Sequence, residues 1–238
     1  GGGRSLPTSV ASPAPGHAVT IGPLPDEFRR SLPMSARSTR LSAAASALHD
    51  RPPPAVEYRI RPANPGAHLF EVSCTVAEPD PAGQVFSLPA WIPGSYMIRE
   101  FARNIVRLRA EADGEPCALE KLDKHTWRAA AVPGARVLSV HYEVYAWDLS
   151  VRTAHLDTTH GFFNGTSVFL AVAGRTEAPC VVTIERPEGD CGRDWKLVTA
   201  LPPEHGHPGQ ACRFGRFRAA LAQARQAVTG FLHTHWRT

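Results

Sequence analysis

Short runs of alternating apolar and polar residues recur from Val56 onward, and they constrain the fold more than any other feature of the chain. Successive side chains of a strand point to opposite faces of its sheet. In residues 136–147, RVLSVHYEVYAW, one such set is therefore expected to face a core: Leu138, Val140, Tyr142, Val144 and Ala146. Pro, Gly and Asp separate the runs, as in antiparallel sandwiches. The pattern predicts a mainly β, antiparallel sandwich-like domain.

Nine segments are predicted to be strands on this pattern, and one segment near the C-terminus is predicted to be a helix. The predicted strands are residues 56–62, 68–76, 84–91, 105–112, 126–132, 136–147, 149–156, 180–187 and 195–201. After the Pro- and Gly-rich residues 200–209, apolar residues recur at helical spacing over residues 216–236, at Phe217, Leu221, Ala224, Val228 and Leu232. This spacing predicts a short amphipathic C-terminal helix.

Composition divides the chain into three parts. Residues 1–54 are rich in Gly, Ser, Pro, Ala and Arg, a composition that buries too little apolar surface to fold, and we expect a disordered tail. Residues 55–204 form the predicted β domain, and residues 205–238 are expected to be a linker with the helix. A start at Met34 and a break in the reading frame near either Arg-rich end are interpretations that the sequence leaves open.

Charge, cysteine spacing and apolar run length exclude several classes of protein. The net charge of +4 comes from the ends, because residues 55–204 hold 15 Lys and Arg against 19 Asp and Glu. No nucleic-acid-binding motif accompanies the positive charge of the ends, and no apolar run approaches the roughly 18 residues of a membrane span. We therefore expect the chain to bind neither nucleic acid nor a membrane. Five widely spaced Cys residues with no Cys-x-x-Cys pair predict reduced thiols and a cytoplasmic location.

The usual enzyme signatures are missing from the sequence. None of the eleven His residues is followed by Glu, so the zinc-peptidase motif His-Glu-x-x-His does not occur. The Gly-x-Ser-x-Gly elbow, the Gly-Lys phosphate loop and the dinucleotide fingerprint are also missing. We expect no catalytic residue and no metal site in this chain.

Residues 88–105, LPAWIPGSYMIREFARNI, form the first stretch with possible functional residues. Trp91, Tyr96 and Phe101 surround a Pro-Gly pair, with Arg99 and Glu100 after them. One interpretation is a strand that turns at the Pro-Gly pair, with its aromatics in the core and Arg99 and Glu100 exposed. The other is an anchor against a partner domain, because Trp, Tyr and Arg concentrate interface energy.

Residues 155–170, HLDTTHGFFNGTSVFL, form the second such stretch. His155, Asp157 and His160 are either metal ligands or, more simply, part of a hydrogen-bonded turn. The FFNG segment that follows suits a tight turn in which Gly165 adopts a positive φ.

Three segments, residues 58–72, 88–105 and 148–170, resemble the N-terminal β domain of the bacterial glycyl aminopeptidases, family sixty-one of the metallopeptidases. The resemblance covers residues 56–204, and residues 215–220 resemble the approach to the next domain. It implies an intact protein with this β domain, a thermolysin-like zinc domain and a PDZ domain, which removes N-terminal Gly or Ala from peptides.

The resemblance implies that the catalytic residues and the zinc belong to the domain that follows. The partners of this chain would be the zinc domain, the PDZ domain and peptides with small N-terminal residues. The β domain would cover the active-site cleft with Tyr96, Arg99, Glu100, Phe163, Asn164 and Thr166. Two alternatives remain: a freestanding β-sandwich protein-binding module, and a self-contained metal enzyme that uses His155, Asp157 and His160.

Overall fold

The computed structural model describes residues 54–189, 193–204 and 214–233. The chain divides into two compact units, Gly1–Pro52 and Pro53–Thr238, and all described residues lie in the second. The predicted tail of residues 1–54 and the predicted linker at residues 205–213 therefore fall almost wholly outside the described residues. The described part is mainly β, with short helices only, as the alternation predicts.

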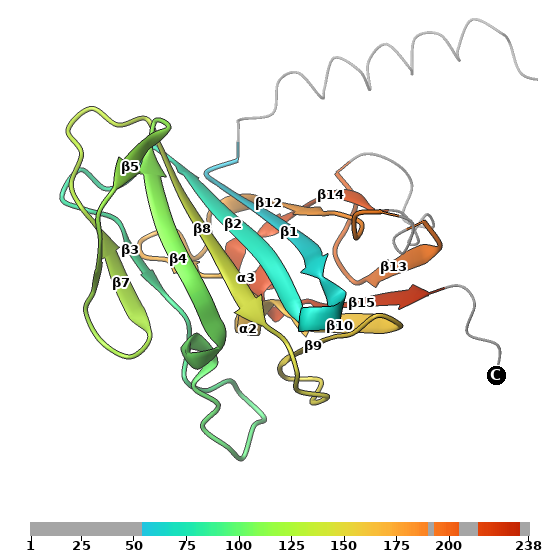
Figure 1. Cartoon of the computed structure of the whole chain (residues 1–238). Coiled ribbons are helices and arrows are strands. Elements are labelled where there is room, and N and C mark those ends of the chain that lie inside the picture. Colours follow the sequence, from blue (N-terminus) through green and yellow to red (C-terminus); the bar gives the residue numbers. More distant parts are fainter. Residues whose placement is uncertain (1–53, 190–192, 205–213, 234–238) are drawn as a thin grey trace, which may run out of the picture. The chain divides into compact units, whose positions relative to one another are not determined.

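The largest sheet has seven strands in the order β14-β12-β1-β2-β8-β4-β5 (Figure 1). In chain order its strands are β1 (Val56–Asn64), β2 (Leu69–Ala77), β4 (Ile105–Ala112), β5 (Glu115–Cys117), β8 (Val137–Tyr145), β12 (Pro179–Ile184) and β14 (Gly215–Ala220). Strands β1 and β12 pair in parallel, and the other neighbours pair antiparallel.

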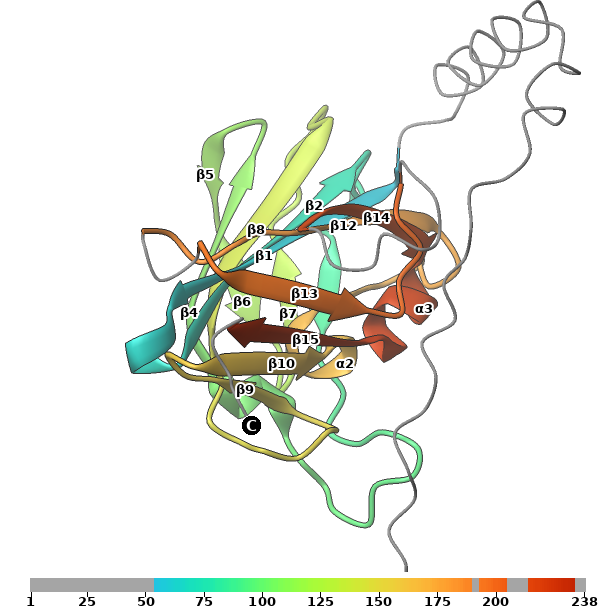
Figure 2. The ribbon, with the colours of Figure 1, turned by 90° about the vertical axis from the view of Figure 1, so that its right-hand side faces the viewer.

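Two four-stranded sheets complete the domain. One has the order β13-β15-β10-β9, and its strands lie side by side in Figure 2; they are β9 (Ala154–Leu156), β10 (His160–Asn164), β13 (Trp195–Thr199) and β15 (Val228–His233). The other has the order β11-β3-β7-β6; its strands are β3 (Val85–Ser87), β6 (Leu119–Lys121), β7 (Thr126–Ala129) and β11 (Ala171–Val172). The short helices are η2 (Pro65–Ala67), η3 (Phe101–Asn104), α2 (Gly165–Val168) and α3 (Leu221–Gln226).

The core lies on the inner face of the large sheet, where alternate residues of β1, β2 and β8 are buried. The core face predicted for residues 136–147 is confirmed, since Leu138, Val140, Tyr142, Val144 and Ala146 are all buried. Burying one such side chain stabilises a fold by about 1.5–3 kcal/mol. Two buried tyrosines fasten the segment after β10 to this sheet: Tyr58 Oη donates to the carbonyl of Leu170, and Tyr142 Oη donates to the carbonyl of Val168 at 2.7 Å.

The C-terminal segment differs from the predicted helix. A short helix is present, but it spans only Leu221–Gln226, between strands β14 and β15. Strand β14 pairs with β12, and β15 lies between β10 and β13. The helical spacing was misleading because Phe217 and Ala219 also alternate, and both are buried on the strand. Pairing with a sheet satisfies the backbone and buries these side chains, which outweighs a weak helical preference.

The other predicted strands differ mainly in extent. Residues 105–112 form β4 as predicted, whereas only Ala154–Leu156 of residues 149–156 is a strand. Strands β5, β6 and β11 were not predicted because they are too short to show alternation, and β10 was not predicted because its residues HGFFN do not alternate. Among the described cysteines, Cys74 and Cys180 are buried free thiols and Cys117 is partly buried. Within the described ranges, no helix has the length and apolar character needed to cross a membrane.

Candidate functional site

Two loops place exposed apolar side chains at one end of the large sheet. The first, residues 88–100, leads through η3 into the start of β4, and the second, residues 146–153, follows the end of β8. Ile105 of β4 pairs with Val144 of β8, so both loops emerge from the same end of the sheet (Figure 1). We call them the loop surface. Its exposed apolar residues are Trp91, Tyr96, Met97, Ile98, Trp147, Leu149 and Val151.

Backbone contacts fix the first loop at its base and leave its tip outside. The N–H groups of Arg99 and Glu100 both donate to the carbonyl of Ala90, at 2.7 and 3.1 Å. The Trp91 indole donates to the carbonyl of Ser95 at 2.6 Å. Phe101 is fully buried, whereas Tyr96 is fully exposed. The interpretation as a strand with its aromatics in the core is therefore wrong for Trp91 and Tyr96, because no described strand pairs with this loop.

Side-chain hydrogen bonds shape the second loop. Asp148 Oδ1 accepts from the backbone N–H of Ser150 at 2.9 Å, and Thr153 Oγ1 donates to the carbonyls of Asp148 and Ser150 at 3.1 and 2.6 Å. Asp and Ser favour such turns because their side chains hydrogen-bond the nearby backbone. Leu149 and Val151 consequently point into solvent.

An ion pair joins the two loops. Arg99 Nη1 lies 3.6 Å from Asp148 Oδ2, and the Arg99 side chain is 14% exposed. Arg99 Nε also donates to Ser95 Oγ at 3.2 Å. A cavity of about 220 Å³ lies between the loops; it is lined by Met97, Ile98, Arg99, Phe101, Arg103, Asn104, Tyr145, Trp147, Asp148 and Thr153. Trp147, Asp148 and Thr153 were not predicted as site residues, although the Asp-x-Ser turn pattern after β8 indicates a turn there.

A larger hollow of about 650 Å³ lies over β1, β2, β4 and β8, but its arginines are already paired with carboxylates, Arg109 with Glu111 among them. Arg61 forms ion pairs with Glu71 and Glu188, and Arg59 forms one with Glu185 at 3.2 Å. We therefore regard it as the solvated outer face of the sheet, not as a site.

Phe163, Asn164 and Thr166 lie next to the second loop, because the backbone N–H of Asn164 donates to the carbonyl of Thr153 at 2.8 Å, but their side chains contact the core and α3. Phe163 is fully buried between Phe70 and Phe169, with ring centroids 5.9 and 5.5 Å away. Asn164 caps α2, and Thr166 Oγ1 donates to the carbonyl of Arg225 at 2.6 Å. These three residues hold α2 in the core and against α3. In the described chain, neither Asn164 nor Thr166 forms a hydrogen bond or ion pair with Tyr96, Arg99 or Glu100.

Gly165 is needed for close packing, not for a turn. Residues 160–164 form a strand that runs directly into α2, so the predicted tight turn is absent at this position, and Gly165 does not have a positive φ. A Cβ atom on Gly165 would lie 2.2 Å from the carbonyl oxygen of Ala224 and 2.9 Å from that of Arg225. Only Gly allows the two helices to approach this closely.

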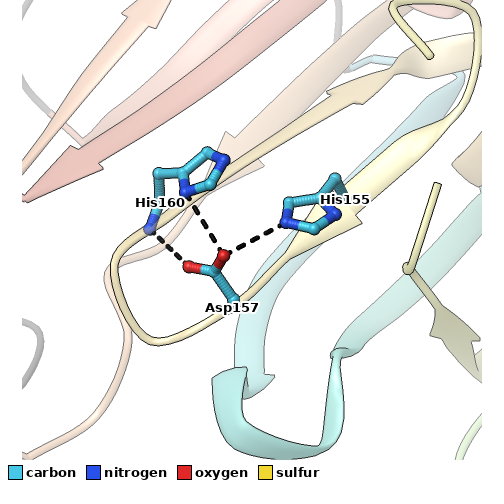
Figure 3. Close-up of side chains that lie close together, drawn as sticks. All are labelled: His155, Asp157 and His160. Carbon is cyan, nitrogen blue, oxygen red and sulfur yellow. Dashed lines mark hydrogen bonds and ion pairs between the residues drawn. The ribbon is translucent and has the colours of Figure 1, made fainter. Parts of the chain in front are cut away.

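The structure brings His155, Asp157 and His160 together on the β9–β10 hairpin (Figure 3). Asp157 Oδ2 lies 3.2 Å from His155 Nε2 and 3.3 Å from His160 Nδ1. His155 is buried, and the other two are half-buried. Burial raises the pKa of Asp157, but hydrogen bonds from the His160 backbone and from Thr159 outweigh it and hold this pKa well below its usual value. Asp157 is therefore an anion at neutral pH.

Ring stacking connects this cluster to the loop surface. The His155 ring lies 4.8 Å from the ring of Trp147, which in turn lies 3.9 Å from the ring of His68. His68 Nδ1 is 2.7 Å from the carbonyl oxygen of Leu156 at the end of β9. Trp147, which belongs to the loop surface and lines the cavity, therefore contacts the cluster through His155.

Comparisons with known proteins place the chain in a family. Residues 57–224 match the family model described as the Peptidase M61 N-terminal domain. Among solved structures, the chain is similar to an aminopeptidase N family protein from Idiomarina loihiensis, with 38% identity and a TM-score of 0.68. That match covers 75% of this chain and 29% of the other, so this chain spans less than a third of that protein.

More distant structures share less of the fold. A mutant M1 zinc metallopeptidase from Deinococcus radiodurans matches with 8% identity and a TM-score of 0.45, over 74% of this chain and 41% of that one. Aminopeptidase A from Legionella pneumophila matches with 8% identity and a TM-score of 0.43, over 78% and 22%. No curated protein sequence matches. On the family match over residues 57–224, the chain belongs to the M61 peptidase family and carries its N-terminal domain.

Proposed function

We propose that this β domain covers the active-site cleft of a zinc aminopeptidase domain, and that the loop surface contacts that domain and confines the amino end of peptides that begin with Gly or Ala. The observation that carries the proposal is the concentration of exposed apolar side chains on two loops joined by the Arg99–Asp148 ion pair. In this proposal the β domain contributes no catalytic residue.

The apolar character of the loop surface supports contact with another protein domain. Tyr96, Met97 and Ile98 are consecutive, and each is more than 60% exposed. Contiguous exposed apolar residues with a polar rim mark interfaces, whereas scattered ones are ordinary. Burying one such side chain against a partner contributes about 1.5–3 kcal/mol. Outside the loop surface, the exposed large apolar residues of the described chain are scattered over β4, β8, β13 and the loops after β6 and β7, for example Val106 on β4 and Val198 on β13.

The charged groups at the loop surface suit the amino end of a peptide. Glu100 and Asp148 present partly exposed carboxylates, each already near one cation. An ammonium group is stabilised by a nearby carboxylate, especially at a site from which water is excluded. Docking of a second domain over the cavity would exclude water from this region.

The catalytic zinc implied by the family does not fit the residues of this chain. The zinc motif of these peptidases needs two His residues and a Glu on one helix, and the sequence has no His followed by Glu. His155, Asp157 and His160 lie on a hairpin with no Glu among them. We derive no catalytic step from these residues.

A chimera tests the proposal. Residues 57–233 would replace the matching segment of the Idiomarina loihiensis relative, and kcat/KM would be measured for the p-nitroanilides of Gly, Ala and Leu. We expect chelator-sensitive hydrolysis that favours Gly and Ala. Ile98→Ser should lower kcat/KM about tenfold, which corresponds to about 1.4 kcal/mol of lost contact energy.

The matched control is Val198→Ser, because Val198 is similarly exposed but lies on β13. This variant should keep kcat/KM within about twofold of the parent chimera. Equal activity of the Ile98 and Val198 variants would refute contact through the loop surface, and it would leave a freestanding binding module as the better account.

A further inference from the structure

We propose that His155, Asp157 and His160 form a binding site for a divalent transition metal ion of the Zn²⁺ class on the β9–β10 hairpin. The site is separate from the proposed function, in which the catalytic zinc belongs to another domain. It would instead stabilise the hairpin and the Trp147 ring that stacks on it.

The hairpin places the three side chains on one face. His155 and Asp157 are two residues apart, at the end of β9, and therefore point to the same side. His160 starts β10 opposite Asp157, since the Asp157 N–H donates to the His160 carbonyl at 2.9 Å. Directly opposite residues of an antiparallel pair share a face. One nitrogen from each His and one Asp157 oxygen consequently lie within 4.8 Å of one another.

The turn between the strands fixes the carboxylate of Asp157 in a ligand-like orientation. Its Oδ1 atom accepts three hydrogen bonds: from the Thr159 backbone at 2.7 Å, from the Thr159 hydroxyl at 2.7 Å and from the His160 backbone at 2.8 Å. The Oδ2 atom is thereby directed between the two imidazole nitrogens (Figure 3). Metal-binding carboxylates are commonly held by such outer hydrogen bonds.

The donor set selects the class of metal. Two imidazoles and one carboxylate suit Zn²⁺, Co²⁺, Ni²⁺ and Cu²⁺, whereas Mg²⁺ and Ca²⁺ prefer oxygen ligands alone. In a tetrahedral zinc site with bonds of about 2.0–2.1 Å, ligand atoms lie about 3.3 Å apart. The two distances from Asp157 Oδ2, 3.2 and 3.3 Å, meet this requirement. The two nitrogens lie within 4.8 Å of each other, so metal binding requires the half-buried His160 ring to move toward His155.

The surroundings predict moderate affinity. His155 is held by the Trp147 ring, but its Nδ1 atom has no hydrogen-bond partner among the described residues. Ligating imidazoles usually donate this second N–H to an acceptor, and loss of such a partner weakens metal binding by about 10–100-fold. Asp157 and His160 are partly exposed, which leaves a path for the ion and a coordination position for water. We therefore expect micromolar binding.

The competing account is a hydrogen-bonded turn, in which both imidazoles donate to Asp157 Oδ2 and no metal binds. The full 238-residue chain, stripped of metal with a chelator, distinguishes the two. It would be titrated with Zn²⁺ by calorimetry and with Co²⁺ by visible absorption, since tetrahedral Co²⁺ has intense bands. We expect one equivalent of Zn²⁺ at micromolar concentration and Co²⁺ bands that Zn²⁺ displaces.

His160→Gln is the test variant and His141→Gln is its matched control. His141 is a half-buried His 3.7 Å from the carboxylate of Glu111, and among the described residues it is not part of a cluster with a second His. His160→Gln should weaken Zn²⁺ binding at least tenfold and abolish the Co²⁺ bands, and His141→Gln should bind as the parent does. Asp157→Asn, which keeps an acceptor oxygen for the turn, should behave as His160→Gln does. Circular dichroism would verify that every variant is folded.

Two outcomes would overturn the proposal. The first is no Zn²⁺ binding by the folded parent chain. The second is equal binding by the parent, His160→Gln and Asp157→Asn, which would assign the ion to other His residues of the chain. Neither outcome bears on the loop surface, so the two proposals fail separately.

Discussion

Arg99 and Asp148 form an ion pair across two loops, with Arg99 Nη1 3.6 Å from Asp148 Oδ2. The loops are far apart in the sequence and meet because β4 begins where β8 ends. The pair lines a cavity of about 220 Å³ whose rim carries exposed Met97, Ile98 and Trp147. The ion pair therefore holds together the loop surface, which we propose contacts the zinc domain.

Arg99→Ala should destabilise the β domain by about 1 kcal/mol, because a mostly buried guanidinium contributes more than an exposed one. The matched control is Arg107→Ala, whose partner Glu143 is also 3.6 Å away but whose side chain is 80% exposed. It should change stability by less than about 0.5 kcal/mol. Urea unfolding measures both variants, and a larger loss for Arg107→Ala would contradict the assignment.

Gly165→Ala should destabilise the domain by about 2–4 kcal/mol, because its Cβ would lie 2.2 Å from the Ala224 carbonyl oxygen and overpacking forces the backbone apart. Gly66→Ala is the control, since its Cβ would make only one ordinary contact at 3.7 Å. Urea midpoints would compare the two. Similar midpoints would mean that α2 and α3 do not pack as described.

Tyr142→Phe should cost about 1–3 kcal/mol, because it leaves the Val168 carbonyl and the Leu170 N–H without their shared hydroxyl. Tyr145→Phe, at a position that is 42% exposed, should stay within about 0.5 kcal/mol of the parent. Thermal unfolding tests this pair. Equal melting temperatures would show that the buried tyrosine does not fasten the segment after β10.

Asp157 should make stability depend on pH in the acid range. Its pKa is lower in the folded chain than the ordinary value of 3.8, so its carboxylate stabilises the fold above about pH 4, and this contribution is lost as the pH falls toward the folded pKa. The stability difference between the parent and Asp157→Asn, measured with chelator present, should be constant near neutral pH and shrink below about pH 4. A difference that grows on acidification would contradict the sign of the shift.

The alternation of apolar residues was sufficient to predict five of the seven strands of the large sheet, namely β1, β2, β4, β8 and β12, but not β5, β14 or the loops. In β8, burial follows every second residue, so Val140 and Tyr142 could be assigned to the core from the sequence. In the first loop, Trp91 and Tyr96 have strand-like composition, and their exposure depends on the lack of a neighbouring strand. The residue types alone do not show whether another strand pairs with this loop.

The candidate residues show the same limit. Phe163, Asn164 and Thr166 belong to a recognisable motif, but their contacts with Phe70 and Arg225, which are distant in the sequence, could not be predicted from it. Gly165 was predicted to be a turn residue because the contact that requires a glycine there, with the carbonyl of Ala224, involves a residue distant in the sequence. The convergence of His155, Asp157 and His160 depends on the pairing of β9 with β10, which the sequence does not reveal because β9 has only three residues and β10 does not alternate.

The proposal that the loop surface contacts the peptidase domain is tested most directly by photo-crosslinking in the chimera with the Idiomarina loihiensis relative. A benzophenone amino acid would replace the fully exposed Tyr96, and, as a control, Val198 on β13. Mass spectrometry would identify the crosslinked peptides. The account predicts crosslinks from position 96 to the peptidase domain and none from position 198. Crosslinks from position 96 only to the β domain, or equal yields from both positions, would contradict it.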